Sequence, residues 1–79
     1  MMNNETIAVT ANWLVDGLSI PRVGSKSFSL KIAASETEER YTKRAIDRAR
    51  ELIASTGNWP PLAVTITDLQ ITRYPPARP

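Results

Sequence analysis

The stretch SETEERYTKRAIDRARELIASTG, residues 35–57, decides the fold, because it carries the signals of one long helix. Ser35 and Glu38 have the spacing of a capping box, in which two side chains bind the free backbone N–H groups of a helix start. Gly57 suits the left-handed residue that ends a helix. The sequence therefore predicts a helix with Ser35 as its N-cap and Gly57 as its end.

This predicted helix is amphipathic. At about 100° per residue, one stripe is formed by residues that are apolar or small: Thr42, Ala45, Ile46, Ala49, Leu52 and Ile53. The opposite face is charged: Lys43, Arg44, Asp47, Arg48, Arg50 and Glu51. Such a helix packs its stripe on another element, and the two central alanines indicate a close approach to a sheet.

Two strands are predicted upstream of the helix. Residues 6–14, TIAVTANWL, and residues 26–33, KSFSLKIA, both alternate apolar and polar positions with the period of a half-buried strand. Between them, the pair Asp16-Gly17 suits a turn, and Pro21 argues against a long central strand. We expect residues 16–25 to form a turn followed by a loop or a short edge strand.

A further strand is predicted downstream of the helix. Trp59 and the two prolines after it form a stiff connector, which leads into residues 62–74. The apolar positions of this segment change phase at Thr67 and Asp68, which indicates a β-bulge or a strand break after residues 62–67.

The order strand, strand, helix, strand predicts a two-layer α+β domain of ββαβ type over residues 6–74. An antiparallel sheet of three strands, or four if residues 18–23 join it, is covered on one face by the single helix. The strand 6–14 is expected in the centre, with 26–33 and 62–67 beside it. The expected core is shared by helix and sheet and includes Trp13, Phe28, Leu30, Ile32, Val64 and Ile66. Residues 1–5 and the proline-rich tail 75–79 are expected to be flexible.

Composition excludes many kinds of chemistry. The chain has 79 residues, with no cysteine and no histidine. Disulfides, thiolate nucleophiles, cysteine-containing zinc sites and Ser-His-Asp catalysis are therefore absent from it. The glutamates near residue 38 are explained by helix capping better than by a metal site. We expect no enzymatic activity, no catalytic residue, no cofactor and no metal.

The sequence has no targeting or membrane signal. Its first residues, MMNNETIAV, contain no basic region followed by an apolar one, and no apolar run approaches the length of a membrane span. We expect a cytoplasmic protein that does not bind membranes, although the lack of cysteine fits an extracytoplasmic location equally well.

Two groups of residues are candidates for binding a partner. The first is the set of basic side chains on the outer side of the helix: Arg40, Lys43, Arg44, Arg48 and Arg50. They can contact nucleic-acid phosphates or an acidic protein surface, or they can form an ordinary solvated face in which Asp47 and Glu51 neutralise them. The second group is Trp59 and Tyr74, which are either rigid aromatic anchors for a partner or lids over the ends of the core.

The sheet face opposite the helix offers a third surface. Its expected residues are small or carry hydroxyl groups, and none is aromatic: Thr6, Ala8, Thr10, Asn12, Ser27, Ser29, Lys31, Ala63, Thr65 and Thr67. Without aromatic side chains this face is a poor platform for stacking RNA bases. It suits flat contact with another protein or with a second copy of the chain, and ordinary strand propensity explains it as well.

No motif of a known protein family is present, so the functional hypotheses rest on size and composition. The leading hypothesis is a small non-enzymatic module that binds a host protein or protein complex. By analogy, compact domains without cysteine or histidine are common among phage accessory proteins, including those that inhibit or adapt a larger host complex, such as anti-CRISPR inhibitors. The alternatives are a nucleic-acid-binding domain that uses the basic helix face and a homodimeric structural protein that pairs through its strand edges.

Overall fold

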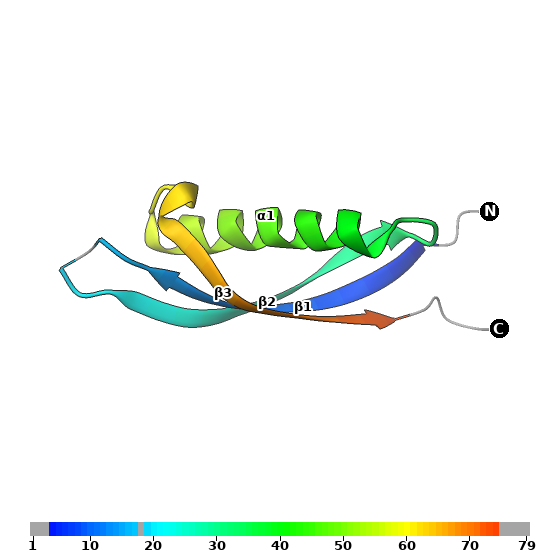
Figure 1. Cartoon of the computed structure of the whole chain (residues 1–79), viewed down its shortest axis with the longest axis horizontal. Coiled ribbons are helices and arrows are strands. Elements are labelled where there is room, and N and C mark those ends of the chain that lie inside the picture. The colour runs from blue at the N-terminus through cyan, green and yellow to red at the C-terminus, as the bar shows by residue number, and fades with distance from the viewer. Residues whose placement is uncertain (1–3, 18, 75–79) are drawn as a thin grey trace.

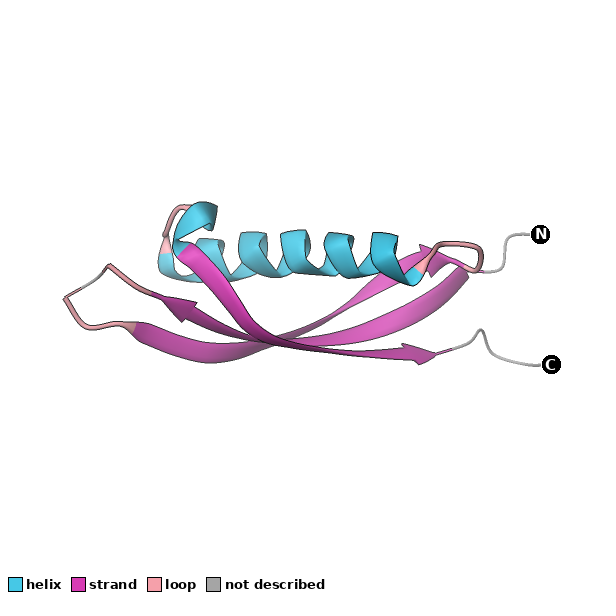
Figure 2. Ribbon diagram, viewed as in Figure 1, coloured by secondary structure: helices cyan, strands magenta, loops and turns pink. Residues whose placement is uncertain are grey.

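The computed structural model of the chain describes residues 4–17 and 19–74. Its elements are the strands β1 (Asn4–Val15) and β2 (Arg22–Ala33), the helix α1 (Glu38–Gly57), a short 3₁₀ helix η1 (Pro61–Ala63) and the strand β3 (Val64–Tyr74). Figures 1 and 2 show α1 lying along one face of a twisted sheet. The predicted two-layer α+β domain of ββαβ order is confirmed.

β1 is the central strand, as predicted, in the sheet order β2-β1-β3. It pairs antiparallel with β2 over its whole length, from Asn4 opposite Ala33 to Val15 opposite Arg22. Residues 22–25, expected in a loop or a short edge strand, belong to this long hairpin. Pro21 does not interrupt it, because the proline precedes the first strand residue and no ladder hydrogen bond is lost.

β3 occupies the other side of β1 and contains the predicted bulge. The pairing runs from Val15 opposite Val64 to Thr6 opposite Tyr74, with a register shift between Asn12 and Trp13 of β1. Beyond the bulge the strand continues to Tyr74, so the shift is not a strand break. The expected strand start at residue 62 is wrong, because residues 61–63 form η1 after the two prolines.

The predicted helix start is also wrong. Thr37, not Ser35, is the N-cap, and its Oγ1 accepts a hydrogen bond from the backbone N–H of Arg40. Before it, the N–H of Glu36 binds the carbonyl oxygen of Ala33 in a turn, which delays the helix by two residues. Ser35 therefore lies in the connection from β2, where it cannot cap.

At its other end the helix stops one residue later than predicted. Asn58 takes the left-handed conformation, with φ 57° and ψ 40°, and its N–H binds the carbonyl oxygen of Ala54. Asparagine tolerates this conformation better than most residues, because its short polar side chain bonds locally. Gly57 is the last helical residue and has a different role, since the ring of Trp59 lies where a Cβ would be.

The core lies between α1 and β1. The helix-facing residues of β1 other than Glu5 and Trp13 are almost completely buried: Ile7, Val9, Ala11 and Val15. In the expected core, Ile32 and Val64 are buried, whereas Trp13, Phe28, Leu30 and Ile66 are only half-buried. A helix about 10 Å wide covers the central strand fully and each outer strand in part.

The helix stripe differs from the prediction in the same way. Ala45, Ala49 and Ile53 are buried as expected, while Thr42, Ile46 and Leu52 are half-buried at the sides of the helix. Tyr41 and Ala54 are buried although the stripe did not include them. Ala54 is covered by the chain that follows the helix, because the N–H of Trp59 binds its carbonyl oxygen.

The two segments expected to be flexible, 1–5 and 75–79, fall largely outside the described residues. Within the described part, residues 4 and 5 belong to β1, which begins two residues before the predicted strand.

Candidate protein-binding surface

The basic residues of α1 do not form one positive surface. Arg44 lies on the β2 side, where its Nη1 donates to both carboxylate oxygens of Glu36 at 2.6 and 2.8 Å. Its Nη2 donates to the carbonyl oxygen of Lys31 at 3.3 Å. The guanidinium of Arg44 therefore joins the helix to β2 and to the connection between them.

The other basic side chains of the helix differ in their surroundings. Arg48 approaches Glu51 at 3.6 Å, which is one of the helix pairs that the sequence predicts. Lys43 and Arg40 are exposed, and the Nε of Arg50 is buried with no hydrogen-bond partner among the described residues. Three of the five side chains thus have an ionic partner or lie partly buried, which weakens the helix face as a phosphate-binding surface.

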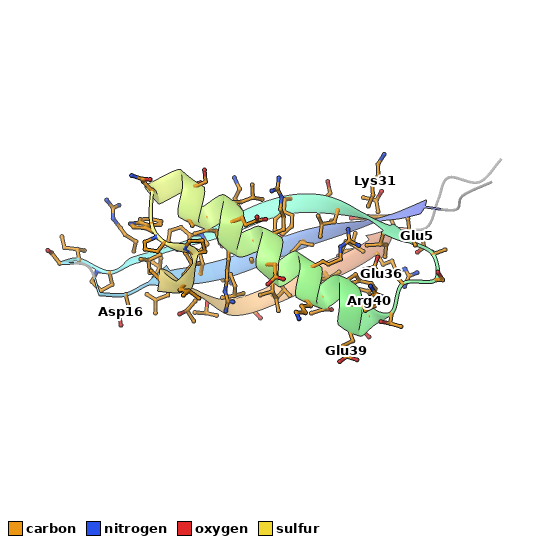
Figure 3. All side chains as sticks on the ribbon, turned by 90° about the horizontal axis from the view of Figure 1, so that it is seen from above. Glu5, Asp16, Lys31, Glu36, Glu39 and Arg40 are labelled. Carbon is orange, nitrogen blue, oxygen red and sulfur yellow. The ribbon has the colours of Figure 1, made fainter. Side chains whose placement is uncertain are left out.

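A second ion pair joins the first strand to the last. Arg73 of β3 donates through Nε to Glu5 of β1 and through Nη2 to the carbonyl oxygen of Ala34 at 3.1 Å. Its guanidinium carbon lies 5.6 Å from the ring centroid of Tyr41. Figure 3 shows Glu5, Glu36 and Arg40 near the helix start, at the end of the molecule opposite Asp16.

Both ion pairs change the acidity of their carboxylates. The hydrogen bond from Arg73, together with its positive charge, lowers the pKa of Glu5 below the ordinary value of 4.5, against a smaller effect of burial. Glu36 also has a lowered pKa, chiefly because of the hydrogen bond from Arg44. The hydrogen bond with Glu5 raises the pKa of Arg73, so this pair is charged at neutral pH. These carboxylates are held as structural anions and are unsuited to proton transfer near neutrality.

Trp59 packs at the hairpin end of the core. Its ring centroid lies 5.6 Å from that of Trp13, and the rings are tilted by 53°. Trp13 in turn lies over Gly24 of β2, where a Cβ would come within 2.7 Å of the ring. Trp59 is half-buried in this contact, so the structure places it as a lid on the core with one part still accessible.

Tyr74 lies at the other end of the sheet. It is 53% exposed and stands opposite Thr6, whose side chain lies on the uncovered face. The expectation that this face has no aromatic residue is therefore wrong, although a single tyrosine at its corner does not make a stacking platform. The basic helix residues, Trp59 and Tyr74 do not converge on one site.

The uncovered face of the sheet carries mostly small or hydroxyl-bearing side chains and is nearly neutral in charge. The hydroxyl groups of Thr10 and Ser27 are 3.1 Å apart, and Ser25 donates to the side-chain oxygen of Asn12. These cross-strand bonds satisfy several polar groups within the sheet itself. Other polar side chains of this face, among them Ser29, Gln70 and Thr72, are exposed.

Two of the most exposed large apolar residues lie in the hairpin loop and at the start of β2, and a third lies in η1. Ile20 and Val23 are each 74% exposed, and Leu62 of η1 is 94% exposed. Figure 1 shows the tip of the β1–β2 hairpin extending past the end of α1, with η1 at the same end of the molecule. We name Ile20, Pro21 and Val23, which line the same open depression, the hairpin-end patch. The sequence-based reasoning missed this patch, because it left residues 18–23 in a loop or a short edge strand.

The hairpin-end patch, together with Ser19 and Arg22, lines an open depression of about 720 Å³. Another open depression, of about 430 Å³, is lined by Ala33, Ser35, Glu36, Arg40 and Arg44. Across residues 4–17 and 19–74, no three acidic side chains lie together in a way that could hold a metal ion. In the same residues, no helix is long and apolar enough to cross a membrane.

Comparison of the chain with models of known protein families, with curated protein sequences and with solved structures finds no match. The argument for function therefore rests on the surfaces described above.

Proposed function

We propose that this protein is a small non-enzymatic module that binds another protein through its hairpin-end patch. The observation that carries the proposal is the exposure of Ile20 and Val23, which line the same open depression at the hairpin end. Exposed apolar residues that gather in one place are typical of protein-interaction sites, whereas single scattered ones are ordinary.

The strand side of the patch is held by the sheet, because Val23 stands in the β1–β2 ladder opposite Leu14. At the turn, Asp16 accepts a hydrogen bond from the N–H of Gly17, whose φ of 86° favours glycine. Behind the turn, Trp13 packs on Gly24 and fixes the hairpin to the end of the core. A preformed surface loses little conformational entropy on binding, which favours affinity.

The charges near the patch favour a protein partner over nucleic acid. Asp16 and Arg22 are the charged residues that flank the turn, so its formal charge is close to zero. Phosphate binding depends on several basic side chains acting together. On α1, the pairing of Arg44 with Glu36 and of Arg48 with Glu51 reduces that capacity. A projecting apolar turn suits a concave apolar groove on a partner protein.

Within this proposal we place a narrower one, that the partner is a larger host complex which the module inhibits or adapts. Phage accessory proteins, including anti-CRISPR inhibitors, are the analogy for it. Its support is the small size of the domain and the lack of cysteine and histidine. Once a bound complex is identified, its activity with and without added protein tests this narrower proposal directly.

A pull-down with matched variants tests the binding proposal. The tagged protein is incubated with a host-type lysate, with and without nuclease, and retained proteins are quantified. The test variant carries Ile20→Asp and Val23→Asp. The control carries Ser29→Asp and Ser35→Asp, which add the same charge at exposed positions away from the hairpin end. Circular dichroism checks that both variants fold.

The expected result is a protein retained in both nuclease arms, lost with the test variant and kept with the control. Equal retention by the test and control variants would remove the hairpin end from the proposal. Retention that disappears with nuclease and weakens steeply with salt would instead support phosphate binding through Arg40, Lys43, Arg44, Arg48 and Arg50.

A further inference from the structure

The outer edge of β3 is a second candidate surface for interaction. β3 is an edge strand in the order β2-β1-β3, and no other described strand pairs with its outer side. The N–H and C=O groups along such an edge are a template for another strand. Beyond the bulge, residues 69–74 form the regular part of this edge.

The two edge strands of the sheet, β2 and β3, differ in their protection against pairing with a further strand. In β2, Lys26 stands opposite Ala11 and so lies on the helix side of the edge strand. An inward-pointing charge on an edge strand is one of the devices that prevent strand addition. In residues 69–74 of β3 the charged side chain is Arg73, which stands opposite Ile7 and so also lies on the helix side, but its charge is paired with Glu5. The β3 edge is therefore less protected than the β2 edge, where Lys26 forms no ion pair among the described residues.

The β3 edge also has apolar surface to cover. Leu69 and Ile71 face the helix side but remain half-buried, whereas their β1 neighbours Ala11 and Val9 are 0% and 1% exposed. The difference arises because α1 lies over β1 and reaches only part of each outer strand. A strand added beside β3 would cover the exposed sides of Leu69 and Ile71, and the burial of this apolar area favours its addition.

We propose that β3 pairs antiparallel with the β3 of a second copy of this chain, about a two-fold axis at Ile71, to form a continuous six-stranded sheet. In this register Gln70 stands opposite the partner's Thr72, and Leu69 stands opposite the partner's Arg73. No charged residue of the edge then meets its own copy, so like charges do not oppose the pairing. The interface is isologous, as in most homodimers.

Sedimentation of the full-length chain over a range of concentrations tests the proposal. The wild-type protein forms a concentration-dependent dimer. The variant with Gln70→Lys and Thr72→Lys places lysine opposite lysine on both sides of the axis and dissociates about tenfold or more readily. Both residues are exposed, so the variant keeps its fold, which circular dichroism checks.

Two further variants make the test specific to this edge and register. Gln70→Glu with Thr72→Lys places opposite charges across the axis and dimerises at least as well as the wild type. Ser27→Lys with Ser29→Lys adds the same two lysines to β2 and leaves the dimer intact. A wild-type chain that stays monomeric at the highest concentration overturns the proposal. If the β2 variant weakens the dimer as much as the β3 variant does, the interface lies on another surface and the proposal is also overturned.

Discussion

At the scale of single residues, two glycines leave room for the rings of two tryptophans. A Cβ at Gly24 would lie 2.7 Å from the ring of Trp13, and one at Gly57 would lie 2.3 Å from the ring of Trp59. Both contacts are far inside van der Waals distance, so a larger residue must displace the ring. Because the two rings pack on each other, these glycines set the geometry of the hairpin end.

Replacing Gly24 tests this dependence. Gly24→Ala should lower the free energy of unfolding by about 1–3 kcal/mol, since the added methyl group overpacks against Trp13. In a Trp13→Leu background the same change should cost less than about 1 kcal/mol, because the ring is gone. Urea denaturation of the four proteins in this cycle measures both values. Equal costs in the two backgrounds would show that the ring contact does not constrain Gly24.

At the scale of elements, substitutions at the start of α1 distinguish its two candidate N-cap residues, Ser35 and Thr37. Thr37→Ala should lower the free energy of unfolding by about 1 kcal/mol, because the N–H of Arg40 loses its acceptor. Ser35→Ala should change it by less than about 0.5 kcal/mol, since Ser35 lies in the connection before the helix. Chemical denaturation compares the two variants directly. A larger loss of stability for Ser35→Ala would show that Ser35 caps the helix together with Glu38, as the sequence predicts.

The same scale shows what local sequence can predict. Alternation located all three strands, because burial of one face imposes a period of two on the side chains. It also located the bulge, since Thr67 and Asp68 break that period between Ile66 and Leu69. The cap was misplaced because Ser35 and Thr37 are both good N-cap residues, and the turn from Ala33 to Glu36 decides between them.

At the scale of the whole molecule, two ion pairs make stability depend on pH: one joins β1 to β3, and the other joins α1 to the connection before it. Glu5 and Glu36 have lowered pKa values in the folded protein because of Arg73 and Arg44. A carboxylate whose pKa is lower folded than unfolded stabilises the fold above its unfolded pKa. That contribution is lost as the pH falls through the folded pKa. We therefore expect the free energy of unfolding to decrease below the ordinary carboxylate pKa of 4.5.

The variant with Glu5→Gln and Glu36→Gln tests this expectation. Urea denaturation at about pH 7 and about pH 3 should show a smaller loss of stability for the variant than for the wild type. Glu39→Gln serves as the control, because Glu39 is exposed and in the described residues forms no ion pair. An unchanged pH dependence in the double variant would mean that other carboxylates cause the acid sensitivity.

The candidate surfaces were less predictable than the fold. The charge pattern of residues 40–51 predicts the pair of Arg48 with Glu51 but not the partner of Arg44, since Glu36 reaches Arg44 only after the chain turns out of β2. The hairpin-end patch follows from how far β1 and β2 extend beyond α1, which depends on tertiary packing. Leu62 is exposed because Pro60 and Pro61 carry the chain through η1 before β3 begins.

The pairing of the last strand with the central first strand has a consequence for synthesis. Glu5 and Arg73 are 68 residues apart in the chain, yet they close the same end of the sheet. While the ribosome still covers residues 64–74, β1 has only β2 and α1 to pair and pack with, and one long side of the central strand is open. The nascent chain thus carries a hairpin that can capture a foreign strand or a chaperone. The time that the chain spends with this side of β1 open depends on how soon residues 64–74 leave the exit tunnel.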